Sequence, residues 1–452
     1  MIRTFALANL ILCLAFVTAI SQVSTGPAPR PLAITHVTVI DATGRSALPD
    51  MTVVIAGDRI TQIGKSAEVR LPRGAQVVNG AGKFLIPGLW DAHVHLSWTT
   101  ASALPVLIAN GVTTVRDMGG RLSELDEWRT KIATGILVGP RIFRAGPILN
   151  GQKFNQYQLV SGNPDETRGV IRALKEAGVD FIKVHRRMPR ESYFAAIDEA
   201  KKQGLTLVGH IPLTVTPEEA SDAGEATIEH TETLFEGTFA AALNGRKLSD
   251  AIRQFRADEA DKLFARFARN HTVSDPTLIA YRTSIDFSDP ALPPNPNLRY
   301  VAVSNKKTLE QFKLPAADLP QWKLTFAELC EVVRQMHTAG VTLIAGTDIA
   351  GPRIPGFSLH EELALLVQCG GLTPMQALQA ATSLPAGVLN KSKDLGTIEV
   401  GKLADLILLD ANPLDDIHNT QQIRAVIVGG KLMNRSALNK LLALGETMAK
   451  QN

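Results

Sequence analysis

The stretch Pro87–Leu96 reads PGLWDAHVHL, and it decides the fold predicted for this chain of 452 residues. Its centre, Gly88–Val94, is a mostly apolar run of strand length that follows a Pro-Gly turn signal. His93 and His95 are two residues apart, so on a strand both imidazoles point to the same face. The pair predicts one side of a metal site; the alternative is two polar side chains facing a wet cavity.

Further strand-like runs alternate with helical stretches along the chain, as parallel β/α units require. Including the first, eight candidate strands are found: Gly88–Val94, Thr113–Asp117, Pro140–Ala145, Phe181–Val184, Leu205–His210, Thr227–His230, His271–Thr277 and Leu343–Asp348. Eight such units predict an α/β protein with a (β/α)8 TIM-like barrel over residues 87–390. A long insertion, about residues 278–324, precedes the last strand, and we expect it to cover the pocket. Within it, Asp286–Leu298 is rich in Pro, Asp and Asn, and we interpret this segment as loop or lid material.

Short β-rich runs broken by glycines occupy both ends of the chain outside the barrel. Residues 31–86 and 391–440 share this texture, and neither part has enough strands to close a core alone. We therefore predict a small β-sandwich domain built from both chain ends.

The first 24 residues differ from the rest and predict an export signal. A positive start is followed by an apolar run, Phe5–Ile20, and by small residues suited to a signal peptidase. An uncleaved membrane anchor is the alternative, although the run is short for a bilayer span. We expect a periplasmic or extracellular protein with no stable membrane span after cleavage. Cys330 and Cys369 would then remain, and we interpret them as two buried thiols, since nothing resembles a disulfide framework.

Composition narrows the classes of partner. Apolar residues make up 45% and charged residues 20%, which suits a globular protein with a real core. The formal charge of +3 is small for this length, and no basic run is interleaved with aromatic residues. We expect a small-molecule or dipeptide substrate and no nucleic acid, and the sequence leaves a homo-oligomer open.

Histidines gather at the carboxyl ends of the predicted strands, where barrels of this type build their chemistry. Five of the ten stand there: His93, His95, His185, His210 and His230. Singly, each would more often be a hydrogen-bonded core residue than a ligand. Asp348 ends the eighth strand, which lies beside the first in a closed barrel, and a carboxylate there is costly unless a cation or donor meets it.

Lys183 lies within the otherwise apolar run Phe181–Val184. A buried lysine needs a partner, and as an ammonium ion it would repel metals. If its amine captured carbon dioxide, the carbamate could bridge two cations. The alternative is a structural lysine paired with a carboxylate at the rim.

The pattern of these residues resembles that of the amidohydrolase superfamily, in the branch of imidazolonepropionase-related proteins and Xaa-Pro dipeptidase-like peptidases. The resemblance extends from about Ala33 to Lys431 and rests on ordered segments: Pro87–Leu96, Gly111–Asp117, Ile182–Val184, Gly209–His210, Ile228–His230, Ala345–Asp348 and Gly396–Leu406. Each segment is weakly specific alone, but the ordered set is highly specific.

The resemblance implies two divalent metal ions, most commonly zinc in this family. One is expected on His93, His95 and Asp348, the other on His210 and His230, with a carbamate on Lys183 as the bridge. Hydrolysis of a C–N amide bond by a metal-bridging hydroxide follows, with Asp348 as general base and then acid. Dipeptides or N-acyl amino acids are the expected substrates.

Substrate contacts are less visible in the sequence. His185 and Arg186 follow the fourth strand and could meet a carboxylate, or they could be solvated loop residues. His360 recurs in the family pattern; it would contact substrate, orient Asp348 or cap a helix. Two other functions stay open: a mononuclear deaminase or imidazolonepropionase-like cyclic-amide hydrolase, and a catalytically silent binding protein.

Overall fold

A computed structural model describes residues 30–236, 247–306 and 309–451. The predicted export signal, residues 1–24, lies outside the described residues. Within them, no helix combines the length and apolar character that a membrane crossing needs.

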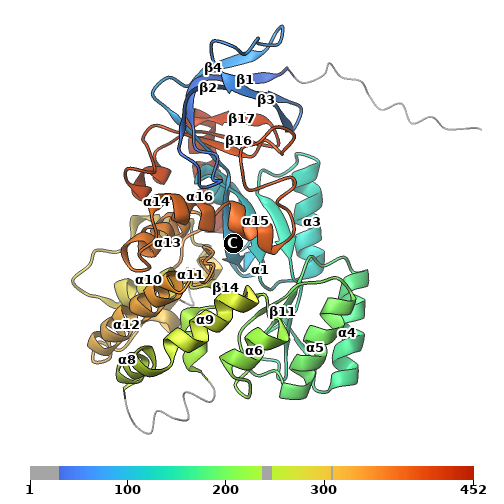
Figure 1. The fold of residues 1–452 in the computed structure, drawn as a ribbon, viewed down its shortest axis with the longest axis vertical. Helices are drawn as coiled ribbons and strands as arrows, with labels where there is room; N and C mark the ends of the chain where they lie inside the picture. The colour runs from blue at the N-terminus through green and yellow to red at the C-terminus, as the bar shows by residue number, and fades with distance from the viewer. Residues whose placement is uncertain (1–29, 237–246, 307–308, 452) are drawn as a thin grey trace, which may run out of the picture.

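Both chain ends contribute to one mixed sheet, at the top of Figure 1. Its eight strands run in the order β17-β16-β15-β5-β1-β2-β3, with β4 paired to β1. Their bounds are β1 Leu32–Val39, β2 Leu48–Ala56, β3 Arg59–Lys65, β4 Gln76–Asn79, β5 Phe84–Pro87, β15 Leu406–Leu409, β16 Ile423–Val428 and β17 Lys431–Asn434. Because β15 pairs with β5, the two ends form one composite sheet, as predicted. All eight strands belong to that single sheet, so a sandwich of two sheets is not confirmed.

The sheet has its own apolar core, which explains why the two ends need each other. Ile34 and Val53 from the first end pack with Leu406 and Ile427 from the second, and all four are at most 1% exposed. Burial of such side chains on one face is what stabilises a sheet.

Parallel strands form the central part of the molecule in two sheets. One has the order β6-β7-β8 and the other β10-β9-β11-β12-β13-β14. Their bounds are β6 Leu89–Val94, β7 Val112–Asp117, β8 Arg141–Arg144, β9 Ile148–Asn150, β10 Gln158–Val160, β11 Ile182–Val184, β12 Leu207–Gly209, β13 Thr227–Glu229 and β14 Val273–Asp275. Seven of the eight predicted strands therefore have a counterpart, with ends shifted by one or two residues.

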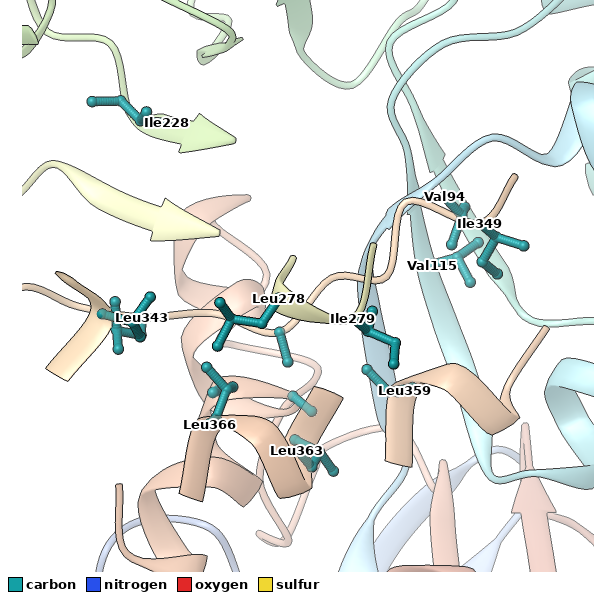
Figure 2. Close-up of a cluster of buried hydrophobic side chains, with 14 of the residues drawn as sticks. Val94, Val115, Ile228, Leu278, Ile279, Leu343, Ile349, Leu359, Leu363 and Leu366 are labelled. Carbon is teal, nitrogen blue, oxygen red and sulfur yellow. The ribbon is translucent and has the colours of Figure 1, made fainter. Parts of the chain in front are cut away.

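The eighth predicted strand, Leu343–Asp348, is not a regular strand. It joins the two parallel sheets through isolated parallel bridges, Ser274 with Leu343 and Val94 with Ile349. In Figure 2, Ile349 lies against Val94 and Val115 while Leu343 lies at the other end of the segment. The arrangement is TIM-barrel-like, and the hydrogen bonding described here is not one continuous ring.

Helices cover the outer side of these strands (Figure 1). Those before the insertion are α1 Leu96–Thr99, α2 Ala103–Ala109, α3 Leu122–Ala133, α4 Pro164–Glu176, α5 Arg190–Lys202, α6 Pro217–Ala223, η1 Thr231–Phe235, α8 Leu248–Asp258 and α9 Ala260–Asn270. Those after it are α13 Phe357–Gln368, α14 Pro374–Ala380, α15 Ser383–Val388, η4 Ile417–Gln421 and α16 Arg435–Gln451. Helix α14 begins with a capping box of Thr373 and Gln376.

The insertion is more ordered than a loop. Its described parts are α10 Leu278–Ser288, η2 Pro296–Tyr300, α11 Val303–Lys306, η3 Leu309–Phe312 and the start of α12 Leu319–Thr338. Leu278 and Ile279 pack against Leu359, Leu363 and Leu366 of α13, which anchors the insertion to the core (Figure 2). The loop expected over Asp286–Leu298 is confirmed for residues 289–295, which form no helix or strand, whereas α10 extends to Ser288 and η2 begins at Pro296.

Cys330 of α12 and Cys369 at the end of α13 form a disulfide. The interpretation as two separate buried thiols was wrong. The helices bring two residues 39 positions apart in sequence to a Cα separation of 4.8 Å, which no local pattern reveals.

Candidate metal and active site

Five imidazoles lie in a row at the carboxyl ends of the parallel strands. Neighbouring ring centroids are 5.4 Å apart for His95 and His93, 4.7 Å for His93 and His230, 4.8 Å for His230 and His210, and 4.5 Å for His210 and His185. The structure thus brings together all five histidines that the sequence placed at strand ends. They line, or lie directly behind, an open cavity of about 400 Å³.

Asp348 joins the row from the irregular eighth segment. Its Oδ1 lies 3.3 Å from His95 Nε2 and 3.7 Å from His93 Nε2, and its backbone N–H donates to the His93 carbonyl at 2.7 Å. Gly346 makes this approach feasible, since a Cβ there would lie 2.6 Å from the His93 Cβ. Asp348 itself has φ 51°, a left-handed conformation that is costly for a non-glycine residue and that recurs at functional sites.

Two rings of the row, those of His95 and His230, are oriented by a hydrogen bond of their Nδ1 atom. His95 Nδ1 lies 3.1 Å from the Gly119 carbonyl, and His230 Nδ1 lies 2.6 Å from Thr277 Oγ1. His93 Nε2 and His210 Nδ1 are buried and find no hydrogen-bond partner among the described residues. Buried nitrogens without partners are unfavourable unless a ligand meets them, so these atoms fit a bound cation.

Lys183 of β11 lies in the wall of the same cavity and is 1% exposed. Its Nζ is also buried without a hydrogen-bond partner in the described part of the chain. Burial lowers the pKa of Lys183 to about 8, with the charge of Arg116 also lowering it and those of Glu229 and Asp348 opposing the shift. A structural ion pair with a rim carboxylate, the alternative interpretation, is not among the described contacts.

Electrostatics favour neutral imidazoles and an ionised Asp348. Burial, followed by the charge of Lys183, lowers the pKa of His93 to about 4, and burial lowers those of His210 and His230 well below their usual value. Burial alone would raise the pKa of Asp348, but the Arg353 charge and the hydrogen bond with His95 hold it well below its usual range. At neutral pH the row therefore offers lone pairs and one carboxylate, the donor set that divalent transition metals prefer.

A buried charge network lies behind His93, and sequence reasoning assigned it no role. Arg116 of β7 contacts both oxygens of Glu229 at 2.8 and 2.9 Å, and Glu229 Oε2 lies 3.1 Å from His93 Nδ1. Arg116 also lies 3.3 Å from Asp275, so its guanidinium occupies the space between the two carboxylates. Charged residues inside the strand runs Val112–Asp117 and Thr227–Glu229 were the available signal.

The outer wall of the cavity combines aromatic and basic side chains. Trp98 stacks on His95 at a centroid distance of 4.2 Å, and the guanidinium of Arg187 lies 4.7 Å over the Phe154 ring. His185 and Arg186 line the cavity too, and Arg186 pairs with Glu236 at 2.7 Å. Trp98, Phe154 and Arg187 were not predicted, because nothing in their local pattern distinguishes them from loop residues.

His360 lies away from this cavity. It is 1% exposed within α13, with Nδ1 2.9 Å from Thr420 Oγ1 and Nε2 3.0 Å from the Asn110 carbonyl. Both nitrogens are thus engaged in holding α13 against neighbouring segments. A contact with substrate or with Asp348 has no support in this geometry.

Comparison with known proteins agrees with the site. Over 85% of this chain and 83% of its own length, the ochratoxinase of Aspergillus niger is 24% identical. The imidazolonepropionase of Alkaliphilus oremlandii is 22% identical over 85% of this chain and 90% of its own length. A solved structure from Bifidobacterium longum, assigned as a prolidase, has a TM-score of 0.69 at 28% identity and covers 93% of this chain and 100% of its own.

The family assignment rests on a match that covers most of the described chain. Residues 84–433 match the amidohydrolase family, and they include every histidine of the row together with Lys183 and Asp348. The relatives named ochratoxinase and imidazolonepropionase align over 83% and 90% of their own lengths. The chain therefore belongs to the amidohydrolase family and is a hydrolase that acts on amide bonds.

Proposed function

We propose that this enzyme hydrolyses the C–N amide bond of dipeptides or N-acyl amino acids with two divalent cations, which we propose to be zinc. His93, His95 and Asp348 would hold one cation, and His210 and His230 the other. The observation that carries the proposal is Lys183, whose buried and unpartnered Nζ lies in the cavity wall among these ligands. A carbamate on that nitrogen would supply the bridging anion that the site otherwise lacks.

The cations would supply Lewis acidity and would lower the pKa of a bound water toward about 7. Asp348 is suited to move the proton, because its carboxylate is ionised and its Oδ2 is fixed by Arg353 at 3.2 Å. It would accept the proton of the attacking water and pass it to the leaving nitrogen. His93, His210 and His230, whose pKa values burial lowers, would only bind and would not transfer the proton.

The cavity walls suit a substrate with one carboxylate and one apolar group. The guanidinium of Arg187 and the neighbouring Arg186 present cations at the rim, where a substrate carboxylate can form charge-assisted hydrogen bonds. Trp98 and Phe154 present apolar surface, and His185 stays neutral because burial lowers its pKa to about 3. A volume of about 400 Å³ accommodates a dipeptide-sized molecule.

A second function keeps the fold but uses a single cation, as a deaminase or a cyclic-amide hydrolase. The similarity to an imidazolonepropionase over 85% of this chain favours keeping this candidate. The number of bound metals separates the two, since Lys183 has no bridging role around one ion.

We also propose that the protein is exported to the periplasm or the exterior after cleavage of residues 1–24. The Cys330–Cys369 disulfide supports this, because such bonds persist mainly in oxidising compartments. The barrel, residues 87–390, and the small domain, residues 31–86 with 391–440, remain our proposed division of the chain.

Replacement of Lys183 tests the main proposal. The purified protein, reconstituted with zinc and bicarbonate, is expected to bind two metal equivalents and to act in a screen of dipeptides, N-acyl amino acids, lactones and cyclic amides. Lys183→Ala should lose metal and activity together, since nothing then bridges the cations. Lys201→Ala is the matched control, because Lys201 is exposed in the last turn of α5.

Two outcomes would count against the bridge. One is a Lys183→Ala protein that keeps both metals and full activity. The other is a wild-type protein that binds a single equivalent whether or not bicarbonate is present, which would favour the mononuclear function. Added acetate should partly restore metal binding to Lys183→Ala, because a small carboxylate can take the place of the missing anion.

A further inference from the structure

A second cavity lies where residues of the barrel and of the composite sheet meet, and none of the proposed metal ligands lines it. Its open volume is about 450 Å³, and its charged lining comes from β3, α3, β8 and the segment after α15. Arg141, which contributes to it, is the first residue of β8, whereas the active site lies at the carboxyl ends of the strands. In Figure 1, α3 lies below the sheet, beside this junction.

Four cationic side chains line this cavity, namely Arg59, Arg129, Arg141 and Lys391, against the single carboxylate of Asp394. Arg59 bonds Asp394 at 2.7 Å and also the Gly401 carbonyl at 2.6 Å. Its hydrogen bond is the main cause that lowers the pKa of Asp394, and the charge of Arg141 acts on the same carboxylate. Asp394 is therefore already engaged by Arg59 and cannot neutralise the remaining cations.

The guanidinium of Arg141 has acceptors for only some of its N–H groups. Its Nη2 lies 3.3 Å from Asp405 Oδ2, while Asp405 Oδ1 accepts a hydrogen bond from the Gly429 N–H at 2.7 Å. The Arg141 Nε is buried and has no hydrogen-bond partner among the described residues. A buried guanidinium N–H without an acceptor is unfavourable, and the Arg141 side chain as a whole is 39% exposed and lines the cavity, so its guanidinium remains available to an oxyanion there.

Lys391 and Arg129 add charge that the protein leaves in excess. Lys391 Nζ lies 5.5 Å over the ring of Phe143, and no ion pair of Lys391 is found among the described residues. Arg129 lies 3.6 Å from Asp126 and 3.9 Å from Asp180. Arg144 lies closer to the same two carboxylates, at 2.7 Å from Asp126 and 3.5 Å from Asp180.

We propose that this junction cavity binds the phosphate group of a small molecule, or free phosphate. Guanidinium groups pair with phosphate oxygens in a planar, often bidentate geometry, and the excess positive charge suits a dianion. The apolar floor, which includes Phe143 and Leu395, leaves room for an uncharged part of such a molecule. Because Arg59 and Lys391 flank Arg141 of the barrel, the bound group would link the two parts of the molecule.

Phosphate binding to the metal-loaded enzyme tests the proposal. We expect inorganic phosphate to raise the melting temperature and to bind in calorimetry, compared with chloride at equal ionic strength. Lys391→Gln should weaken this binding about tenfold, the loss expected for one charge-assisted hydrogen bond. That variant breaks no ion pair of the described structure, so it should fold normally. Lys393→Gln is the control, since Lys393 is exposed and is not part of the cavity lining.

The same titrations distinguish this cavity from the metal centre, which phosphate could also reach. Binding at the metals would survive Lys391→Gln and Arg141→Gln unchanged, and that result would overturn the proposal. So would an equal response to chloride. A sugar phosphate that binds more tightly than phosphate identifies an esterified ligand, whereas equal affinity identifies free phosphate; both outcomes support the site.

Discussion

The mouth of the barrel and the core of the composite sheet handle burial in opposite ways. The sheet buries apolar side chains such as Ile34, Val53 and Ile427. The barrel mouth buries Lys183 and His93 just as deeply and leaves a polar atom of each without a hydrogen-bond partner among the described residues. Unpaired buried polar groups lower stability, so the mouth is the part of the molecule shaped by binding and the sheet is the part shaped by folding.

The largest effect is expected at the barrel mouth, where Asp348→Asn should lower kcat. The amide cannot accept the proton that the carboxylate takes, so kcat should fall by about 10²–10⁴-fold. KM should change far less, because the side chain is not expected to carry substrate binding. Steady-state kinetics with metal content measured in parallel checks this. Unchanged turnover in a metal-replete variant would remove Asp348 from its role as proton shuttle.

In the sheet, Ile34→Ala should have the converse effect. Ile34 is 0% exposed, and truncation of a buried isoleucine typically costs about 2–5 kcal/mol of the free energy of unfolding. Metal content and kcat should stay at the wild-type level below the melting transition. Val77→Ala, at a side chain that is 52% exposed on β4, is the control and should change stability by less than about 0.5 kcal/mol. A loss of metal in Ile34→Ala would show that the two regions are coupled.

The same contrast explains what the sequence alone could predict. Short apolar runs have a clear signature, so seven strands of the barrel and the pairing of the chain ends were predicted to within a few residues. The eighth segment was predicted as a strand because Leu343–Ala345 is apolar, but the structure pairs it only through isolated bridges at Leu343 and Ile349. Asp348, the last residue of the predicted strand, has φ 51°, which lies outside the extended conformation of a strand.

Contacts between distant segments account for what was missed. Arg116 and Asp275 stand 159 positions apart and meet only inside the barrel, so each looked like an isolated polar residue in a strand. The Cys330–Cys369 disulfide was missed for the same reason, because only the packing of α12 against α13 brings the two cysteines together. His360 shows the opposite error: it recurs in the family pattern, yet both its nitrogens serve packing.

The smallest expected effect, and the sharpest test of the contrast, comes from the residues behind His93. In the wild-type protein the Glu229 carboxylate holds the N–H of His93 Nδ1, so that His93 Nε2 is free to bind metal. Glu229→Gln keeps the shape of the side chain but removes this charge. Metal affinity, measured by competition with a chelator, should fall about 10–100-fold. The melting temperature should fall too, because Arg116 loses one of its two buried carboxylate partners and keeps only Asp275.

Thr227→Val separates these two consequences. Thr227 accepts a hydrogen bond from Arg116 Nη1 at 3.0 Å and donates one to Glu229 Oε1, but no contact with His93 is described. Because Thr227→Val keeps the Glu229 charge beside His93 Nδ1, it should lower stability much more than metal affinity. If Glu229→Gln behaved like Thr227→Val, the network would serve only folding, like the apolar core of the sheet. If metal affinity falls only in Glu229→Gln, the buried charges behind His93 belong functionally to the mouth, although no substrate or solvent reaches them.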